Sequence, residues 1–290
     1  MIRLSLLPLI LFSVCSWAQT IKGRTNTVKV DYSEPVVAKK APDEIIPKNR
    51  RKNRALIMGV SKYQHEGPGL QSLDNPTKDA QLLYDMLTSN YTFDPADVIL
   101  LKDPTRQNII DSFDKLAEEA TENDNVLVFY AGHGVWDKQK DLGYWLPSDA
   151  ELKSKSAWIA NSQIKDFLSN NVIRSKHTLL ITDACFGGSI FKSRSVSAET
   201  IMRINELYKE PSRKAMTSGN LSAVPDKSIF IQQLLMKLGD NEEDFLPAQH
   251  LFARIYEPIV NNAATNPLYG IIQGAGDGGG DFIFIKRKPD

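Results

Sequence analysis

The sequence predicts an α/β fold in which a mostly parallel sheet carries helices on both faces. Short apolar runs, typical of strands buried on both sides, recur at residues 55–60, 98–101, 126–130 and 178–182. Amphipathic stretches typical of helices lie between them, at residues 79–87, 105–120 and 164–168. This alternation of strand and helix favours a doubly wound sheet with right-handed crossovers.

The carboxy-terminal part shows shorter signals of the same kind. The pattern predicts one strand, two helices and a final pair of strands, at residues 214–217, 228–238, 246–261, 269–273 and 281–285. The glycine-rich stretch 274–280 joins the final pair. No helix follows it and no Lys-Ser/Thr or repeated Asp spacing accompanies it, so a turn is favoured over a phosphate or calcium loop. The long polar stretch 189–213 is predicted to be a functional or disordered loop.

The first 53 residues are expected to precede the folded domain. Arg3, the apolar stretch Leu4–Val14 and the small-x-small sequence ending at Ala18 predict a signal peptide over residues 1–18 and export to the periplasm or the extracellular space. A buried strand or short helix is the alternative. Val14 is bulky for the residue before a lipidated Cys15, which favours soluble export. Residues 19–53 are polar, contain three prolines and end in a basic run, as in a linker or pro-segment.

Net charge is zero over the whole chain, so bulk electrostatics give no support to a nucleic-acid partner. The charge is unevenly distributed, however. Residues 22–54 hold ten Lys and Arg against four Asp and Glu, which leaves the remainder of the mature chain acidic. A weakly acidic body favours basic substrates, but only weakly.

The chain has two cysteines, Cys15 and Cys185. Removal of the signal peptide would leave Cys185 alone, and no intramolecular disulfide or thiol-redox pair would then be possible. An unpaired cysteine in an exported protein suggests a thiol kept for its reactivity. The alternative is a buried cysteine that acts as a small hydrophobic residue.

Two short segments carry the candidate chemistry. Residues 129–134 read Phe-Tyr-Ala-Gly-His-Gly, and residues 181–188 read Ile-Thr-Asp-Ala-Cys-Phe-Gly-Gly. Each follows a predicted buried strand, and sites in open α/β sheets form at the carboxyl ends of strands. A thiol needs a base or a cation to become a thiolate, and an oxyanion needs preorganised N–H donors. A pair formed by Cys185 and His133 beside glycine amides meets both needs.

With these two segments the chain resembles caspase-like cysteine peptidases, and metacaspases more than animal caspases, from Arg54 to about Lys286. The histidine lies 52 residues before the cysteine, close to the caspase spacing. Supporting segments lie at residues 54–63, 70–80, 143–147, 217–219 and 280–282. The resemblance implies a caspase-like sandwich with a six-stranded sheet. It also implies a peptidase domain over residues 54–288, divided into a large-subunit-like part, a processing loop and a small-subunit-like part at 54–188, 189–213 and 214–288.

The same resemblance implies the role of each site residue. Cys185 would attack the scissile carbonyl, His133 would shuttle protons, and the N–H groups of Gly134 and Cys185 would form the oxyanion hole. Asp79 and Asp183 match the acidic specificity pocket of metacaspases, which implies cleavage after Arg or Lys. Without the resemblance, Asp183 could simply cap a turn and Asp79 could be a helix first-turn acid.

The sequence departs from the family pattern at two positions. Ala131 stands before the Gly-His pair, and Pro76 stands where many metacaspases carry Cys, which puts the fine specificity of the pocket in question. No cofactor or metal is expected. Calcium activation cannot be carried over because no ligand set matches, and the other three histidines read as surface or structural residues: His65, His177 and His250.

Proteins or peptides with basic residues are the expected partners, and the protein is expected to be a monomer without a transmembrane anchor. Its own basic sites in predicted exposed segments are candidates for self-processing, namely Arg50-Arg51-Lys52, Arg194, Arg203, Lys209 and Arg213-Lys214. A catalytically silent interaction module of the same fold is the alternative function. A serine α/β-hydrolase is not supported, because no Gly-x-Ser-x-Gly motif occurs.

Overall fold

A computed structural model describes residues 51–184, 190–191, 204–219, 227–263 and 266–288. These residues all belong to one compact unit of the chain. Its central sheet has six strands in the order β10-β8-β7-β3-β1-β2, of which only β10 runs antiparallel to its neighbour. The strands are β1 (Asn53–Gly59), β2 (Phe93–Lys102), β3 (Asn125–Ala131), β7 (His177–Asp183), β8 (Ser212–Thr217) and β10 (Leu268–Ile271). The predicted mostly parallel six-stranded sheet is confirmed.

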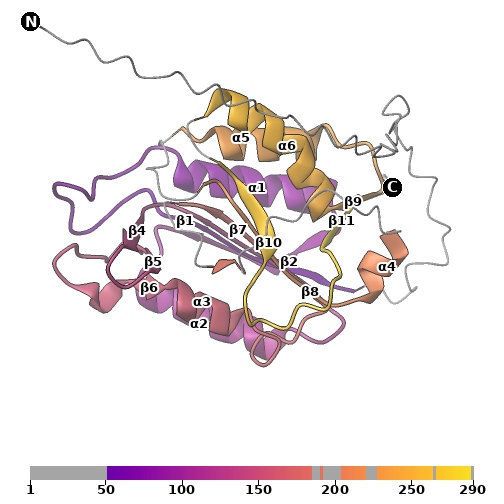
Figure 1. The fold of residues 1–290 in the computed structure, drawn as a ribbon, viewed down its shortest axis with the longest axis horizontal. Coiled ribbons are helices and arrows are strands. Elements are labelled where there is room, and N and C mark those ends of the chain that lie inside the picture. Colours follow the sequence, from indigo (N-terminus) through magenta and orange to yellow (C-terminus); the bar gives the residue numbers. More distant parts are fainter. Residues whose placement is uncertain (1–50, 185–189, 192–203, 220–226, 264–265, 289–290) are drawn as a thin grey trace, which may run out of the picture. The chain divides into compact units, whose positions relative to one another are not determined.

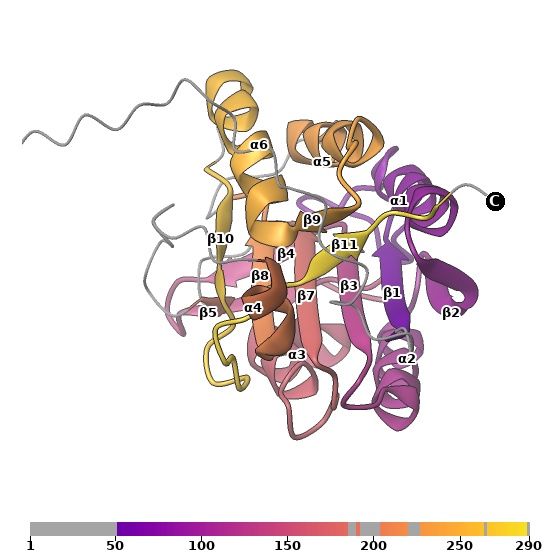
Figure 2. The ribbon, with the colours of Figure 1, turned by 90° about the vertical axis from the view of Figure 1, so that its right-hand side faces the viewer.

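Helices cover both faces of the sheet (Figures 1 and 2). One face carries α1 (Pro76–Asn90), α5 (Ile229–Gly239) and α6 (Ala248–Asn262). The opposite face carries α2 (Arg106–Glu119) and α3 (Asn161–Phe167). Among the described residues, no helix is long and apolar enough to cross a membrane.

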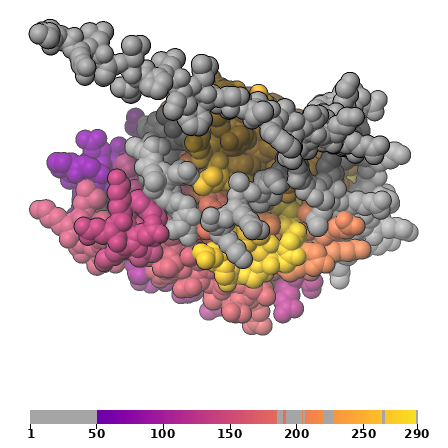
Figure 3. All heavy atoms as spheres, viewed as in Figure 1, coloured from indigo at the N-terminus to yellow at the C-terminus, as the bar shows by residue number. Residues whose placement is uncertain are grey.

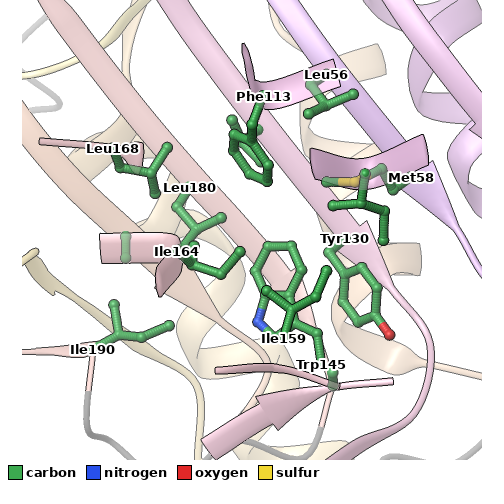
Figure 4. Close-up of a cluster of buried hydrophobic side chains, with 14 of the residues drawn as sticks. Leu56, Met58, Phe113, Tyr130, Trp145, Ile159, Ile164, Leu168, Leu180 and Ile190 are labelled. Atoms are coloured by element: carbon green, nitrogen blue, oxygen red, sulfur yellow. The ribbon is translucent and has the colours of Figure 1, made fainter. Parts of the chain in front are cut away.

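The central residues of β1, β3 and β7 are apolar because alternate side chains enter two separate cores. Leu56, Val128 and Leu180 pack in the core beneath α2 and α3. Their neighbours in sequence, such as Leu127 and Leu179, pack in the core beneath α1, α5 and α6. Figure 4 shows part of the first core, where the Trp145 side chain lies among residues from strands and helices.

The helix starts follow the residue types that the sequence offers. Thr105 caps α2 through a capping box with Asn108. Pro76 occupies the first turn of α1, where its missing N–H is not needed. Ser228 caps α5 by accepting a hydrogen bond from the backbone of Ile231.

Sequence patterns missed a small antiparallel sheet that follows β3. It consists of β4 (Gly134–Asp137), β5 (Leu142–Trp145) and β6 (Ile159–Ala160), with the 3-10 turn η1 (Lys155–Ala157) before β6. Strands of two to four residues are too short for an alternation pattern to stand out. This sheet begins one residue after His133 and therefore borders the candidate site.

The prediction of a final pair of strands was wrong in its pairing. β10 pairs with β8, whereas β11 (Ile283–Ile285) pairs with β9 (Phe245–Pro247) in a separate two-stranded sheet. Residues 246 and 247, expected to start a helix, therefore belong to β9, and α6 begins at Ala248. The glycine-rich residues 274–280 form the predicted loop between β10 and β11.

The predicted processing loop is ordered at its carboxy-terminal end. Residues 204–209 form α4 (Ile204–Lys209), and β8 already begins at Ser212. The backbone N–H of Asp281 donates to Leu207, and those of Gly278 and Gly280 donate to Pro211. Figure 3 shows the glycine-rich loop, in yellow, beside the orange residues of α4 on one face of the molecule.

Arg213 and Lys214 do not lie in an exposed segment, contrary to the sequence prediction. Arg213 is 0% exposed, and its guanidinium donates to the carbonyls of Ser175 and Ser212 at 2.8 Å. Lys214 is 8% exposed and forms an ion pair with Asp277 at 3.1 Å. Carbonyl acceptors and a buried carboxylate offset the desolvation of both cations, which is why the polar sequence could form an inner strand.

Candidate active site

The site is defined by the register of two adjacent parallel strands. β3 and β7 pair without a shift from Asn125 opposite His177 to Ala131 opposite Asp183. Just beyond the last pair, the N–H of Gly132 donates to the carbonyl of Asp183 at 3.4 Å. In the sequence, His133 follows the end of β3 by two residues, and position 185 follows the end of β7 by two residues. Cys185 itself lies outside the described residues.

The imidazole of His133 is oriented by the loop that follows β1. Its Nε2 lies 2.8 Å from the backbone carbonyl oxygen of Gln71. A carbonyl can only accept, so Nε2 carries the proton and Nδ1 is left as the basic nitrogen. The ring of Tyr63 packs against the imidazole with centroids 5.1 Å apart, and its hydroxyl accepts the backbone N–H of His133 at 2.8 Å.

The carbonyl of His133 is held as firmly as its N–H. It accepts from the N–H of Leu146 at 3.1 Å, and the Tyr130 hydroxyl lies 2.9 Å from it. Gly132 makes this turn possible, because it has φ +155, which side chains rarely allow, and a Cβ there would lie 3.1 Å from the Tyr63 hydroxyl. The backbone on both sides of the imidazole is thus fixed before any substrate binds.

The loop that supplies Tyr63 and Gln71 is anchored at several points. The N–H groups of Ser61 and Lys62 both donate to the Asp103 carboxylate, at 2.6 and 2.8 Å. The carbonyl of Ser61 also accepts from Leu73, which closes the loop on itself. Because these bonds involve main-chain groups, the loop conformation depends little on its own side chains.

Asp183, the last residue of β7, is a buried carboxyl group. It is 5% exposed, and its Oδ1 has no hydrogen-bond partner among the residues that the structure describes. Burial raises the pKa of Asp183 from 3.8 to about 6, and the hydroxyls of Ser218 and Ser228 offset only part of this effect. The charge of Asp79 raises the pKa further, so the two acids that the sequence singled out share one neighbourhood.

Asp79 lies in the first turn of α1, which is the position that the alternative explanation of this residue required. Its place on the helix and its closeness to Asp183 are compatible with each other. Gly134, expected to supply an oxyanion N–H, is the first residue of β4 and pairs with Trp145 of β5. Across the described ranges, no group of three or more His, Cys, Asp or Glu side chains could hold a metal ion.

Sequence reasoning missed the two groups that orient His133. A backbone carbonyl such as that of Gln71 leaves no signal in residue types. Tyr63 belongs to residues 54–63, which support the family resemblance, but the sequence alone indicated no role for it. The hydroxyls near Asp183 were missed for a related reason: Ser218 follows β8, Ser228 caps α5, and both reach Asp183 only through the fold.

The ionisation of Asp183 should be visible in stability. A folded-state pKa of about 6 against 3.8 means that the folded protein binds the proton more tightly, so this group's contribution to stability is lost as pH rises from about 4 to about 6. We expect Asp183→Asn to become more stable relative to wild type over this window, by about 3 kcal/mol at most. Urea unfolding at several pH values measures it.

Asp114→Asn, at an exposed position on α2, is the matched control for this experiment. It should follow the wild-type pH dependence. An Asp183→Asn curve parallel to wild type from pH 4 to pH 7 would contradict the raised pKa.

Comparisons with known proteins agree with this geometry. Residues 52–265 match the caspase domain, which is well over half of the chain. The chain therefore belongs to the caspase-domain family of cysteine peptidases. The match includes β3, His133, β7 and position 185.

The curated relatives are metacaspases. Metacaspase III c of Phaeodactylum tricornutum is 21% identical over 238 residues, which is 77% of this chain and 64% of that protein. Metacaspase-1 of Saccharomyces cerevisiae is 21% identical over 201 residues, covering 63% of this chain and 44% of the relative. Metacaspase-1 of Schizosaccharomyces pombe is 30% identical over 181 residues, covering 58% and 42%. The chain thus spans less than two thirds of each of these three proteins.

Proposed function

We propose that this protein is a cysteine endopeptidase that cleaves after Arg or Lys, with Cys185 as nucleophile and His133 as base. The observation that carries the proposal is the register of β3 and β7, which ends the two strands side by side, two residues before His133 and two residues before position 185 in the sequence. The Gln71 carbonyl, beside Nε2 of His133, supports the imidazole tautomer that the proposal needs. Membership of the caspase-domain family supports the same chemistry.

In the proposed reaction, Nδ1 of His133 takes the proton of the Cys185 thiol, and the sulfur attacks the scissile carbonyl carbon. The resulting oxyanion accepts hydrogen bonds from the N–H groups of Gly134 and Cys185. The imidazolium then returns the proton to the leaving amine as the C–N bond breaks. Water, deprotonated by the same imidazole, hydrolyses the thioester, and the thiol is restored. Throughout, the Gln71 carbonyl stabilises the imidazolium by accepting from Nε2.

Specificity for basic side chains is proposed on the basis of Asp183 and Asp79. The carboxylate of Asp183 is buried and its Oδ1 has no hydrogen-bond partner among the described residues, so a cation or a hydrogen-bond donor at this oxygen would stabilise it. An Arg or Lys side chain supplies both and pairs with the carboxylate by charge-assisted hydrogen bonds. The neighbouring charge of Asp79 disfavours an acidic substrate side chain at the same place.

Loss of either reacting group should abolish turnover. We expect Cys185→Ala and His133→Ala to reduce kcat for Arg and Lys reporter peptides by at least about 1000-fold, since nucleophile and base act as a unit. Purified full-length variants assayed with fluorogenic peptides measure this. His65→Ala is the matched histidine control, because its side chain is 48% exposed and lies beside Glu151. Wild-type turnover by Cys185→Ala would refute the assignment.

Removal of the charge at position 183 should affect basic substrates specifically. We expect Asp183→Asn to lower kcat/KM for Arg and Lys peptides about 10- to 100-fold, because charge-assisted bonds become neutral ones. For wild type, KM should fall as pH rises through about 6, where the carboxyl group ionises. A positional-scanning peptide library on both proteins measures the preference. Equal preference for Arg in both would exclude Asp183 from the pocket.

In the predicted processing loop, self-processing is proposed to take place within residues 192–203. Lys209 lies in α4 next to the buried Tyr208, and Arg213 and Lys214 are buried in β8. Arg50-Arg51-Lys52 remains a candidate before the domain. Within the predicted loop, Arg194 and Arg203 remain as candidates, and both lie outside the described residues. The chain is anchored on either side of them, since Ile190 accepts a backbone hydrogen bond from Gln273 and α4 is bonded to the glycine-rich loop.

We therefore expect new termini after Arg194 or Arg203 and none after Arg213, with both fragments eluting together in size-exclusion chromatography. Mass spectrometry of wild type against Cys185→Ala measures the termini. Identical fragment patterns in the two proteins would reject self-processing, and cleavage after Arg213 would contradict the described fold of β8.

A further inference from the structure

Tyr63 contacts the candidate base from a position that no part of the proposed reaction uses. The residue is 5% exposed and lies in the loop after β1, four residues past the end of that strand. Its ring faces the His133 imidazole with centroids 5.1 Å apart and an interplanar angle of 47°. Its hydroxyl accepts the His133 N–H at 2.8 Å and lies 3.4 Å from the carbonyl of Val60.

We propose that Tyr63 is a positioning residue for the catalytic imidazole, which it holds by the main-chain N–H and by the ring face together. This inference rests on the proposed peptidase function. The hydroxyl fixes where the His133 backbone lies, and the aromatic ring limits how the imidazole can rotate. With Nε2 bound to Gln71, three separate contacts determine where Nδ1 points.

The loop geometry explains why Tyr63 can act as a rigid support. Ser61 and Lys62, just before it, donate to Asp103, and Gln64, just after it, donates to the carbonyl of Ser148 at 2.8 Å. Tyr63 is thus held on both sides by the main chain. Burial raises the pKa of the Tyr63 hydroxyl well above its usual value, so the group stays protonated and can donate while it accepts.

The close approach to Gly132 shows that the contact is specific in space. A Cβ on Gly132 would lie 3.1 Å from the Tyr63 hydroxyl and 3.1 Å from Cβ of Val60. The hydroxyl therefore occupies a gap that exists because residue 132 has no side chain. A tyrosine that served only to fill the core would not need its polar end placed against the backbone of the histidine.

Tyr63→Phe tests the proposal, because it keeps the ring and removes only the hydroxyl, which accepts from His133 and donates to Val60. We expect kcat for an Arg reporter peptide to fall about 10-fold while KM stays within about 2-fold, since a displaced base impairs the chemical step more than binding. Tyr91→Phe is the matched control: Tyr91 is 1% exposed, and its hydroxyl donates to the Leu238 carbonyl at 2.8 Å, in the other core. It should keep wild-type kcat at a similar loss of stability.

A second measurement, which needs no substrate, distinguishes a misplaced His133 imidazole from a general loss of protein stability. Iodoacetamide alkylates the Cys185 thiolate, and mass spectrometry of the peptide that contains Cys185 gives the rate at each pH. We expect the alkylation profile of Tyr63→Phe to lie at higher pH than that of wild type, toward the profile of His133→Ala. The reason is that a misplaced imidazole accepts the thiol proton less well. Tyr91→Phe should leave the profile unchanged. If Tyr63→Phe does not fold, Tyr63→Met serves as the second variant.

The outcomes separate the two proposals. If wild type cleaves Arg peptides, and Tyr63→Phe matches it in both kcat and alkylation profile, the positioning role is overturned and the peptidase function stands. If wild type cleaves no basic peptide while Tyr63→Phe still shifts the alkylation profile, the positioning role stands and the proposed function fails. If Tyr91→Phe lowers kcat as much as Tyr63→Phe does, the positioning role of Tyr63 is also overturned, since loss of stability alone would then explain the effect.

Discussion

The pairing of three parallel strands in one register is the constraint on which the site depends. β1 and β3 pair from Asn53 opposite Asn125 to Gly59 opposite Ala131, and β3 and β7 continue the same register to Asp183. The three strands therefore end at one level. The segments that leave them carry, in order, the loop with Tyr63 and Gln71, then His133, then position 185. A slip by one residue in any of these strands would turn its side chains to the opposite face and separate these groups.

The two ends of the sheet are used differently. At the amino-terminal end of the parallel strands, His177 is fully buried, and its Nδ1 lies 2.9 Å from the Ser212 hydroxyl. Arg51 is also close to His177, and its guanidinium lies over the ring of Tyr208. Burial lowers the pKa of His177 to about 3, with Arg51 adding to the effect, so this imidazole stays neutral and structural. At the carboxyl end, His133 is only half-buried and has its tautomer set by a carbonyl. One residue type thus serves two purposes because its surroundings differ.

Much of the fold could be predicted from residue patterns, because long apolar runs and capped helices are local signals. The apolar runs that end at Tyr130 and Thr182 form the inner strands β3 and β7, and the stretch that begins at Thr105 forms α2. What failed depended on distant partners. Arg213 is typical of a loop residue by sequence, but in the fold its guanidinium donates to the carbonyls of Ile173, Ser175 and Lys176. Residues 246 and 247 are typical of the start of a helix by sequence, but in the fold they belong to β9, which pairs with β11.

The candidate site combines local and distant signals in the same way. His133 and Cys185 stand out because each follows an apolar run; glycines flank His133, and two glycines lie two and three residues after Cys185. The contacts that orient the imidazole do not, since Tyr63 and Gln71 lie more than 60 residues earlier in the chain and act through a hydroxyl and a main-chain carbonyl. Residue types identify which groups could react, whereas only the fold shows how they are held.

The energetics of Asp183 connect the fold to the proposed specificity. A shift of the carboxyl pKa from 3.8 to about 6 means that at neutral pH the folded protein holds this charge at a cost of about 3 kcal/mol relative to water. A stable inner strand could end in a neutral residue without that cost, as β3 does at Ala131. The cost is recovered only when a cation or donors reach the carboxylate. A substrate side chain that neutralises Asp183 would therefore gain binding energy that an apolar side chain could not. The proposed preference for basic substrates would then follow from a destabilising feature of the unliganded fold.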